Sequence, residues 1–207
     1  GRDAAYFASL GHKVVAVEPV DEMREGGKKL HPSPAIEWLA DGLPDLALLR
    51  ARHQPFDAVL MTAVWMHLDE AERRRGMPNV AELARPGGVV SMTLRYGPVP
   101  EGRRMFEVST GETIALARES GLAVILDEIE PTHLKRVKPV TWKRLVFRRR
   151  MMSQSGFGAL VPQAVGLIIG SYDSQTDVSS LVYLNGDGTM SLRCATADVA
   201  PEPHEVG

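Results

Sequence analysis

Cysteine is nearly absent from this sequence, because Cys194 is the only one among its 207 residues. A single cysteine excludes an internal disulfide framework and any metal site built on several cysteine ligands. It also makes a reducing, cytoplasmic location the default expectation. Cys194 falls in a predicted hairpin strand with no base or second ligand near it, and we expect its role to be structural.

Long apolar runs are missing as well, so no segment approaches the length that crosses a membrane, and no secretory signal is visible. The formal net charge is only −2, yet the charges are unevenly distributed. Residues 151–207 hold six acids and one base, Arg193, and contribute −5, which leaves +3 for the first 150 residues. This change of sign predicts a boundary near Arg150, between a domain of residues 1–150 and an acidic extension of residues 151–207.

Helix and strand patterns alternate five times from residue 2 to residue 127, which predicts an α/β fold with helices on both faces of a mostly parallel sheet. Asp69 with Glu72, and Ser109 with Glu112, have the spacing of a capping box at two helix starts. Pro78 is expected to kink or restart the fourth helix. The expected helices are 2–10, 21–30, 45–52, 69–84 and 109–121, and the expected strands are 14–17, 35–40, 56–63, 89–94, 122–127 and 141–148.

The last two of these strands are expected to pair antiparallel, because the linker 128–140 contains two prolines and offers no helix for a parallel crossover. Further along, two strands flank residues 185–188, Asn-Gly-Asp-Gly, which is a strong β-hairpin signal. We therefore expect a small β-hairpin extension whose end, 201–205, is disordered. The apolar strand 165–169 could fill the centre of the sheet, but we do not favour this placement, because no glycine-rich loop follows it.

The pattern most specific to a function lies in the first nineteen residues. Gly1 opens a short helix, Gly11 ends it, and the apolar strand 14–17 stops at an acid, Glu18. In α/β nucleotide-binding folds a glycine-rich turn leads into a helix, and an acid about 20 residues further on binds the ribose hydroxyls. These residues therefore indicate the second half of a nucleotide-binding unit, with Gly1 as the last glycine of its turn.

With three later segments, this pattern resembles the class I S-adenosylmethionine-dependent methyltransferases over residues 1–149. Residues 1–3 resemble the end of the family's glycine-rich cofactor loop, and residues 15–19 resemble its second strand with the ribose-binding acid. Residues 40–44 resemble the turn after the third strand, residues 56–68 the fourth strand with its active-site end, and residues 85–88 the turn before the fifth strand. The resemblance implies a Rossmann-like fold and methyl transfer from S-adenosylmethionine to a small-molecule acceptor. The family's first strand and most of its glycine-rich loop have no counterpart before Gly1. We therefore expect a chain truncated at its start that binds the cofactor weakly or not at all.

The resemblance also implies a set of cofactor-binding residues, namely Gly1, Arg2, Asp3, Glu18, Asp41, Gly42, Leu43, Thr62, Trp65 and Met66. Glu18 is expected to accept hydrogen bonds from the ribose hydroxyls. Asp41 is expected to meet the adenine amino group, although an Asp-Gly pair also simply forms a turn. Trp65 and Met66 have two interpretations: they contact the adenine or the sulfonium, or they cover the core where the next helix begins.

Methyl transfer is an in-line displacement, so the protein mainly has to hold two reactants in position, and a base is required only when the acceptor must lose a proton. His67, after the strand 56–63, is the histidine placed to act as that base, with a structural or capping role as the alternative. Substrate contact is the hypothesis for Arg95, Tyr96, Arg103 and Arg104, after the strand 89–94, and solvated or packing roles are the alternative. No metal site is expected.

Two other classes of function fit parts of the pattern. An NAD-dependent oxidoreductase also uses an acid at a strand end, but Asp41 and the antiparallel last pair favour a methyltransferase. A binding module without catalysis could keep the same scaffold. Eight basic residues between positions 135 and 150 could indicate nucleic acid, but several fall on a predicted edge strand, where such charges discourage edge pairing. We therefore expect neither a nucleic-acid partner nor a membrane partner.

Overall fold

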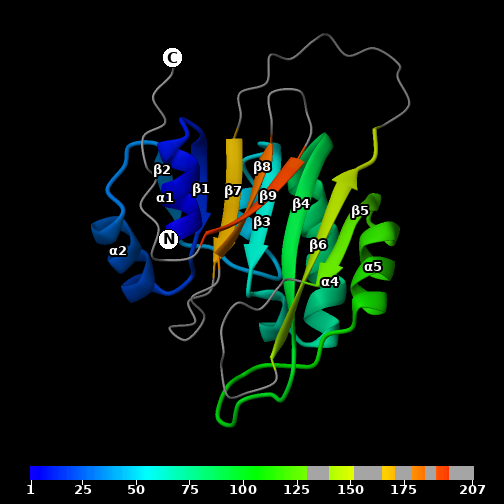
Figure 1. Ribbon diagram of the computed structural model, residues 1–207. Helices are drawn as coiled ribbons and strands as arrows, with labels where there is room; N and C mark the ends of the chain where they lie inside the picture. The colour runs from blue at the N-terminus through cyan, green and yellow to red at the C-terminus, as the bar shows by residue number, and fades with distance from the viewer. Residues whose placement is uncertain (130–139, 152–164, 171–178, 185–189, 196–207) are drawn as a thin grey trace, which may run out of the picture. The chain divides into compact units, whose positions relative to one another are not determined.

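The computed structural model describes residues 1–129, 140–151, 165–170, 179–184 and 190–195, the last three ranges as backbone only (Figure 1). Contacts divide the chain into two compact units, Gly1–Ser171 and Tyr172–Gly207. The first unit is built on a seven-stranded sheet in the order β2-β1-β7-β3-β4-β6-β5. Its strands are β1 (Lys13–Val17), β2 (Ile36–Leu39), β3 (Phe56–Thr62), β4 (Ala84–Tyr96), β5 (Leu122–Ile129), β6 (Thr141–Arg149) and β7 (Val165–Gly170).

Most of this sheet is parallel, as the alternation of helices and strands predicts. β2, β1, β7, β3 and β4 run in the same direction. β6 runs antiparallel to both of its neighbours, β4 and β5. The expected antiparallel pair at the end of the sheet is therefore confirmed.

The centre of the sheet differs from the expectation. β7 pairs in parallel with β1, from Lys13 opposite Val165 onward, and with β3, up to Thr62 opposite Gly170. The expectation that residues 165–169 lie outside the sheet centre is therefore wrong. Without β7, β1 and β3 would each leave a row of backbone N–H and C=O groups unpaired in the middle of the sheet, whether or not a glycine-rich loop follows. The unit boundary moves accordingly, from Arg150 to Ser171.

The second unit contains a two-stranded antiparallel ladder. β8 (Ser179–Leu184) pairs with β9 (Met190–Ala195), which confirms the predicted hairpin. Cys194 lies opposite Ser180 in the backbone register of this pair. The predicted turn 185–188 and the terminal segment 201–205 lie outside the described residues.

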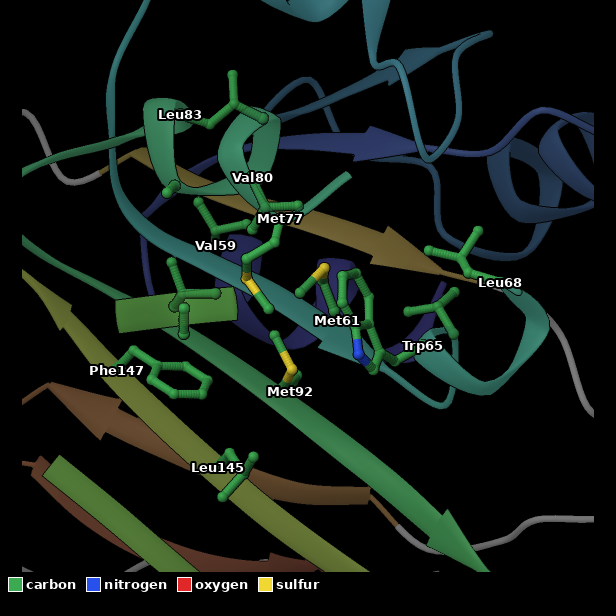
Figure 2. Close-up of a cluster of buried hydrophobic side chains, with 14 of the residues drawn as sticks. Val59, Met61, Trp65, Leu68, Met77, Val80, Leu83, Met92, Leu145 and Phe147 are labelled. Carbon is green, nitrogen blue, oxygen red and sulfur yellow. The ribbon is translucent and has the colours of Figure 1, made fainter. Parts of the chain in front are cut away.

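Helices cover both faces of the sheet in the first unit, as expected. Successive residues of a strand point to opposite faces. Val14 and Ala16 of β1 belong to a smaller hydrophobic cluster with Ala4 of α1, whereas Val15 and Val17 belong to a larger cluster with α3, α4 and α5. Figure 2 shows part of the larger cluster. The helices are α1 (Arg2–Ser9), α2 (Asp21–Leu30), α3 (Ala47–Arg50), α4 (Glu70–Leu83) and α5 (Thr110–Glu119), with one turn of 3-10 helix, η1 (Trp65–His67).

The start of α4 follows the predicted capping box. The Asp69 carboxylate accepts a hydrogen bond from the Glu72 N–H at 2.8 Å, and the Glu72 carboxylate accepts one from the Asp69 N–H at 2.9 Å. α4 continues through Pro78 without the expected restart, because Pro78 and Arg74 lie on its exposed side, where water can satisfy the freed Arg74 carbonyl. α3 is shorter than the expected helix 45–52, and Leu46 at its start has a left-handed backbone with φ 47°.

The predicted Pro-Gly-Gly turn, residues 85–88, lies inside β4, where the pairing with β3 shifts register between Ala84 and Val89, and this irregularity requires a glycine at position 88. A Cβ atom on Gly88 would lie 2.9 Å from the carbonyl oxygen of Arg85, 3.0 Å from that of Asp57 and 3.1 Å from that of Phe56. These backbone atoms cannot rotate away as the tip of a side chain can, so a larger residue would push β3 and β4 apart.

Candidate functional site

The candidate site lies at the carboxyl ends of the parallel strands, the edge at which open α/β sheets bind ligands. Glu18 directly follows β1, Asp41 lies two positions beyond β2, and Thr62 is the last residue of β3. His67 ends η1, and the loop between β4 and α5 spans residues 97–109. The topology therefore brings candidates that are far apart in the sequence to one edge.

Glu18 is an acid with only 8% of its surface exposed. Its Oε1 atom accepts a hydrogen bond from the N–H of Val20 at 2.9 Å, and no group among the described residues donates to Oε2. Burial raises the pKa of this carboxyl, and the Val20 N–H and the Arg24 guanidinium act in the opposite direction. A carboxylate with an unfilled oxygen can accept hydrogen bonds from the hydroxyl groups of a ligand.

Asp3 and Thr62 are joined although they lie 59 positions apart in the chain. The Thr62 hydroxyl donates a hydrogen bond to Oδ2 of Asp3 at 3.0 Å. This bond ties the first turn of α1 to the carboxyl end of β3, so two of the predicted cofactor residues meet. Gly1 is the N-cap of α1 and Arg2 is its first residue, and both are exposed.

Asp41 differs from Glu18 because both of its carboxylate oxygens already have partners. Oδ1 accepts a hydrogen bond from the Gly42 N–H and Oδ2 accepts one from the Leu49 N–H, each at 2.9 Å. These bonds build the turn after β2 and attach it to α3, while the half-buried Leu43 packs against the larger cluster. The structure therefore shows the turn-forming role, and an adenine contact by Asp41 would have to use a remaining lone pair.

Trp65 and Met66 lie in the core rather than on the ligand edge. Trp65 is completely buried and Met66 nearly so, and both belong to the larger hydrophobic cluster (Figure 2 shows Trp65 within it). The expectation that these side chains contact the cofactor is replaced by their packing role, because η1 turns them inward under the start of α4. The indole N–H of Trp65 is a buried donor without a partner among the described residues.

Two hydrogen bonds join His67 and Arg104, each between the side chain of one residue and the backbone carbonyl of the other. Nδ1 of His67 lies 2.9 Å from the carbonyl oxygen of Arg104, and the Arg104 guanidinium donates to the carbonyl oxygen of His67 at 2.5 Å. The same guanidinium donates to Glu72 at 2.7 Å and lies 5.2 Å from the centre of the Phe106 ring. The hydrogen bond from Arg104 lowers the pKa of the Glu72 carboxyl. We call His67, Glu72, Arg104 and Phe106 together the Arg104 latch.

Two other predicted substrate residues have partners within or beside the loop after β4. The Arg95 guanidinium donates to the carbonyl oxygens of Gly97 and Pro98, at 3.4 and 3.1 Å. The hydroxyl groups of Tyr96 and Thr110 are hydrogen-bonded to each other. Arg103 is exposed to solvent.

Two features of this edge were missed at the sequence level. Ala63, directly after β3, has a left-handed backbone with φ 57°, and its N–H donates to the Thr93 hydroxyl at 2.9 Å. A left-handed alanine is uncommon, and such strain gathers at functional edges. Glu72 takes part in the Arg104 latch, although its spacing from Asp69 predicts only a helix cap.

The described groups at the edge are acids, a hydroxyl, an imidazole and guanidinium groups, all of which bind ligands through hydrogen bonds or charge. Within the described ranges, no three histidine, cysteine or acidic side chains lie close enough together to hold a metal ion. In the same part of the chain, no helix is both long and apolar enough to cross a membrane.

The sequence of this chain is similar to those of methyltransferases. Residues 1–88 match a family model described as a methyltransferase domain. Over 134 residues the chain is 27% identical to an uncharacterized methyltransferase of Oceanobacillus iheyensis. That match covers 64% of this chain and 56% of the relative, so the chain spans little more than half of the relative's length.

Comparisons of structure give the same fold. A 1,6-didemethyltoxoflavin N1-methyltransferase of Burkholderia thailandensis, solved with 1,6-didemethyltoxoflavin and S-adenosylhomocysteine bound, matches with a TM-score of 0.53 at 19% identity, over 72% of this chain and 67% of that one. A putative S-adenosylmethionine-dependent methyltransferase of Listeria monocytogenes matches with a TM-score of 0.59 at 12% identity, over 72% and 86% of the two chains. At these identities the likeness shows the fold alone.

Proposed function

We propose that this chain is a class I S-adenosylmethionine-dependent methyltransferase, which transfers a methyl group from S-adenosylmethionine to a small molecule. The observation that carries the proposal is Glu18, a nearly buried acid at the carboxyl end of β1 whose Oε2 receives no hydrogen bond from the described residues. The small molecule and S-adenosylhomocysteine bound to the Burkholderia thailandensis neighbour support both the kind of acceptor and the cofactor. The single cysteine supports a cytoplasmic setting for this activity.

The residues at the edge fit a cofactor that carries a ribose. The unfilled Oε2 of Glu18 would accept hydrogen bonds from the ribose hydroxyls, and Gly42 and Leu43 would flank the adenine. Asp3 and Thr62, joined to each other, would border the cofactor from the start of α1 and the end of β3. The bound cofactor supplies a methyl group activated on a sulfonium, and the protein holds the methyl acceptor in line with it.

The acceptor side of the proposal lies in the loop after β4. Arg95 and Arg104 already bind backbone carbonyls in this loop and in η1, so they shape the acceptor site. Arg103, which is exposed, is proposed to contact an anionic or planar acceptor directly.

Calorimetric titration with S-adenosylhomocysteine tests the proposed function. Wild type is expected to bind it, and Glu18→Gln is expected to weaken binding by about ten- to a hundred-fold, because hydrogen bonds to a charged acceptor contribute about 1.5–3 kcal/mol. Glu22→Gln, which removes an exposed acid from the first turn of α2, is the matched control and should bind like wild type. Binding of NAD in place of S-adenosylhomocysteine would contradict the proposal and favour an oxidoreductase.

A further inference from the structure

The hydrogen bond from His67 decides which of its ring nitrogens carries the proton. The partner of Nδ1 is the carbonyl oxygen of Arg104, which can only accept a hydrogen bond, so Nδ1 must be the donor. In a neutral imidazole the other nitrogen, Nε2, then carries a lone pair and no proton. His67 is half-buried at the carboxyl edge of the sheet, so the geometry presents a proton acceptor at the edge where the proposed methyl acceptor binds.

We propose that His67 accepts the proton of the methyl acceptor at Nε2, and that Arg104 is the positioning residue that orients its ring. This inference rests on the proposed function and narrows its substrate class. The acceptor would be a small molecule whose reacting nitrogen or oxygen still carries a hydrogen at neutral pH. An acceptor that is already an anion, such as a thiolate, would not need His67.

The step balances without a further reactant. As the acceptor nitrogen or oxygen forms its bond to the methyl carbon, the bond between that carbon and the sulfonium sulfur breaks, and its electron pair stays on the sulfur. The acceptor's proton passes to Nε2 of His67. The resulting imidazolium keeps its Nδ1–H bond to the Arg104 carbonyl and returns the proton from Nε2 to solvent when the products leave.

The Arg104 guanidinium orients the ring because it joins three separate groups. It donates to the carbonyl oxygen of His67, donates to Glu72 on α4, and lies over the ring of Phe106. The Phe106 N–H also donates to the Met66 carbonyl oxygen at 2.8 Å, which fastens the loop to η1 a second time. These contacts hold the Arg104 carbonyl opposite Nδ1.

Two acids contact the Arg104 guanidinium. Glu72 lies 2.7 Å from it and Asp69 lies 3.8 Å from it. The pKa of Glu72 is lowered by its hydrogen bond from Arg104, so Glu72 and Arg104 form an ion pair at neutral pH. This ion pair is expected to keep the ring oriented while the acceptor's proton passes to Nε2.

Nitrogen NMR of the whole protein labelled with 15N histidine tests the ring assignment directly. The His67 signals are identified by their loss in His67→Asn, and the shifts of the two ring nitrogens report which one is protonated. The expected result is the form with the proton on Nδ1. A neutral His67 with its proton on Nε2 would overturn the proposal. This measurement needs no ligand, so its outcome is independent of the titration with S-adenosylhomocysteine.

The role of Arg104 is tested in the same spectra. Arg104→Ala is expected to move His67 towards a mixture of the two neutral forms, whereas Arg118→Ala, which removes an exposed arginine from the last turn of α5, should leave the signals unchanged. An Arg104→Ala spectrum identical to wild type would contradict the positioning role. Thermal unfolding of both variants verifies that they are folded.

Methyl transfer to two probes, phenol and thiophenolate, tests the catalytic role. The reacting oxygen of phenol carries a hydrogen at neutral pH, so His67→Asn is expected to lower kcat for phenol by about 10²–10⁴-fold with little change in KM. The rate with thiophenolate, which has no proton to lose, should be unaffected. An unchanged rate with phenol, or a wild type that methylates only thiophenolate, would overturn the proposal.

Discussion

The two halves of the ligand edge differ in how far their polar groups are already satisfied. Beside β1, Glu18 keeps one carboxylate oxygen without a donor among the described residues. Beside β3 and β4, the Arg104 latch uses its guanidinium and the Nδ1 of His67 for internal bonds. The first half can therefore accept hydrogen bonds from a ligand, whereas the polar groups of the second half already hold one another.

The largest expected effect on stability comes from breaking the ion pair between α4 and α5, the helices on the side of the sheet edge that carries the Arg104 latch. Arg73 of α4 is only 4% exposed, and it donates to the Leu68 carbonyl oxygen at 2.6 Å and to both carboxylate oxygens of Glu112 of α5, at 2.9 and 3.1 Å. Arg73→Ala is expected to lower the free energy of unfolding by about 3 kcal/mol, because it leaves Glu112 without its buried partner. Urea denaturation measures this loss.

Arg74→Ala is the matched control for that experiment. Arg74 is the next residue of α4, but it is exposed and pairs with Glu70 at 3.2 Å on the helix surface. Its loss is expected to cost at most about 0.5 kcal/mol. Equal losses for the two arginines would show that the link between α4 and α5 does not stabilise the latch half.

Two adjacent glycines of α2, Gly26 and Gly27, test how α2 packs on β2 in the half of the edge that contains Glu18. A Cβ atom on Gly27 of α2 would lie 2.3 Å from the nearest Trp38 ring atom, whereas one on Gly26 would meet nothing within 4 Å. Gly27→Ala is therefore expected to lower the free energy of unfolding by about 1–3 kcal/mol through overpacking. Gly26→Ala should raise it by about 0.5–1 kcal/mol, since alanine favours the helix. Changes of the same sign would contradict this packing of α2 on β2.

The third prediction concerns the charge of Glu18 itself. Burial raises the folded-state pKa of this carboxyl above its ordinary value of 4.5, so the folded protein holds the proton more tightly than the unfolded chain does. Stability therefore falls as the pH rises from the unfolded value through the raised folded value, and the loss persists at neutral pH. Glu18→Gln removes that loss, so its Tm should exceed that of wild type at neutral pH.

The difference in Tm should shrink on acidification, because the wild-type carboxyl becomes protonated as well. Thermal unfolding between about pH 4 and pH 7 measures the trend. A difference that grows towards low pH would contradict the assigned direction of the pKa shift. Together with weaker binding of S-adenosylhomocysteine, a more stable variant would show that the unfilled oxygen is kept for a ligand.

The smallest expected effect is the stability contributed by the latch. Arg104 and Glu72 form a partly exposed ion pair at 2.7 Å, and such pairs contribute about 0.2–1 kcal/mol. A double-mutant cycle with Arg104→Ala and Glu72→Ala separates this coupling from the capping role of Glu72. A coupling well above that range would mean that the latch stabilises the fold rather than orienting His67.

The parts of the structure predicted from the sequence have local causes. Glu72 lies three positions after Asp69, and a capping box depends only on that spacing. Gly121 ends α5 with a φ of 80°, a conformation that glycine adopts without strain. Glu18 was placed correctly at the edge because the end of a strand follows from its apolar run.

The parts that could not be predicted depend on contacts between distant segments. Whether residues 165–170 lie inside the sheet is decided by the unpaired edges of β1 and β3, which a linear pattern does not show. His67 and Arg104 are 37 positions apart, and their pairing depends on the path of the loop after β4. Trp65 had two compatible interpretations, and only the inward turn of η1 distinguishes core from ligand contact.

The place of β7 in the sheet has a consequence for synthesis of the chain on the ribosome. Lys13 of β1 pairs with Val165, which is 152 positions later, so β1 and β3 are made long before the strand that joins them. At about 5–20 residues per second, that interval lasts roughly 8–30 seconds. During this time two apolar strands have open edges, which is the situation in which nascent chains need chaperones to avoid aggregation.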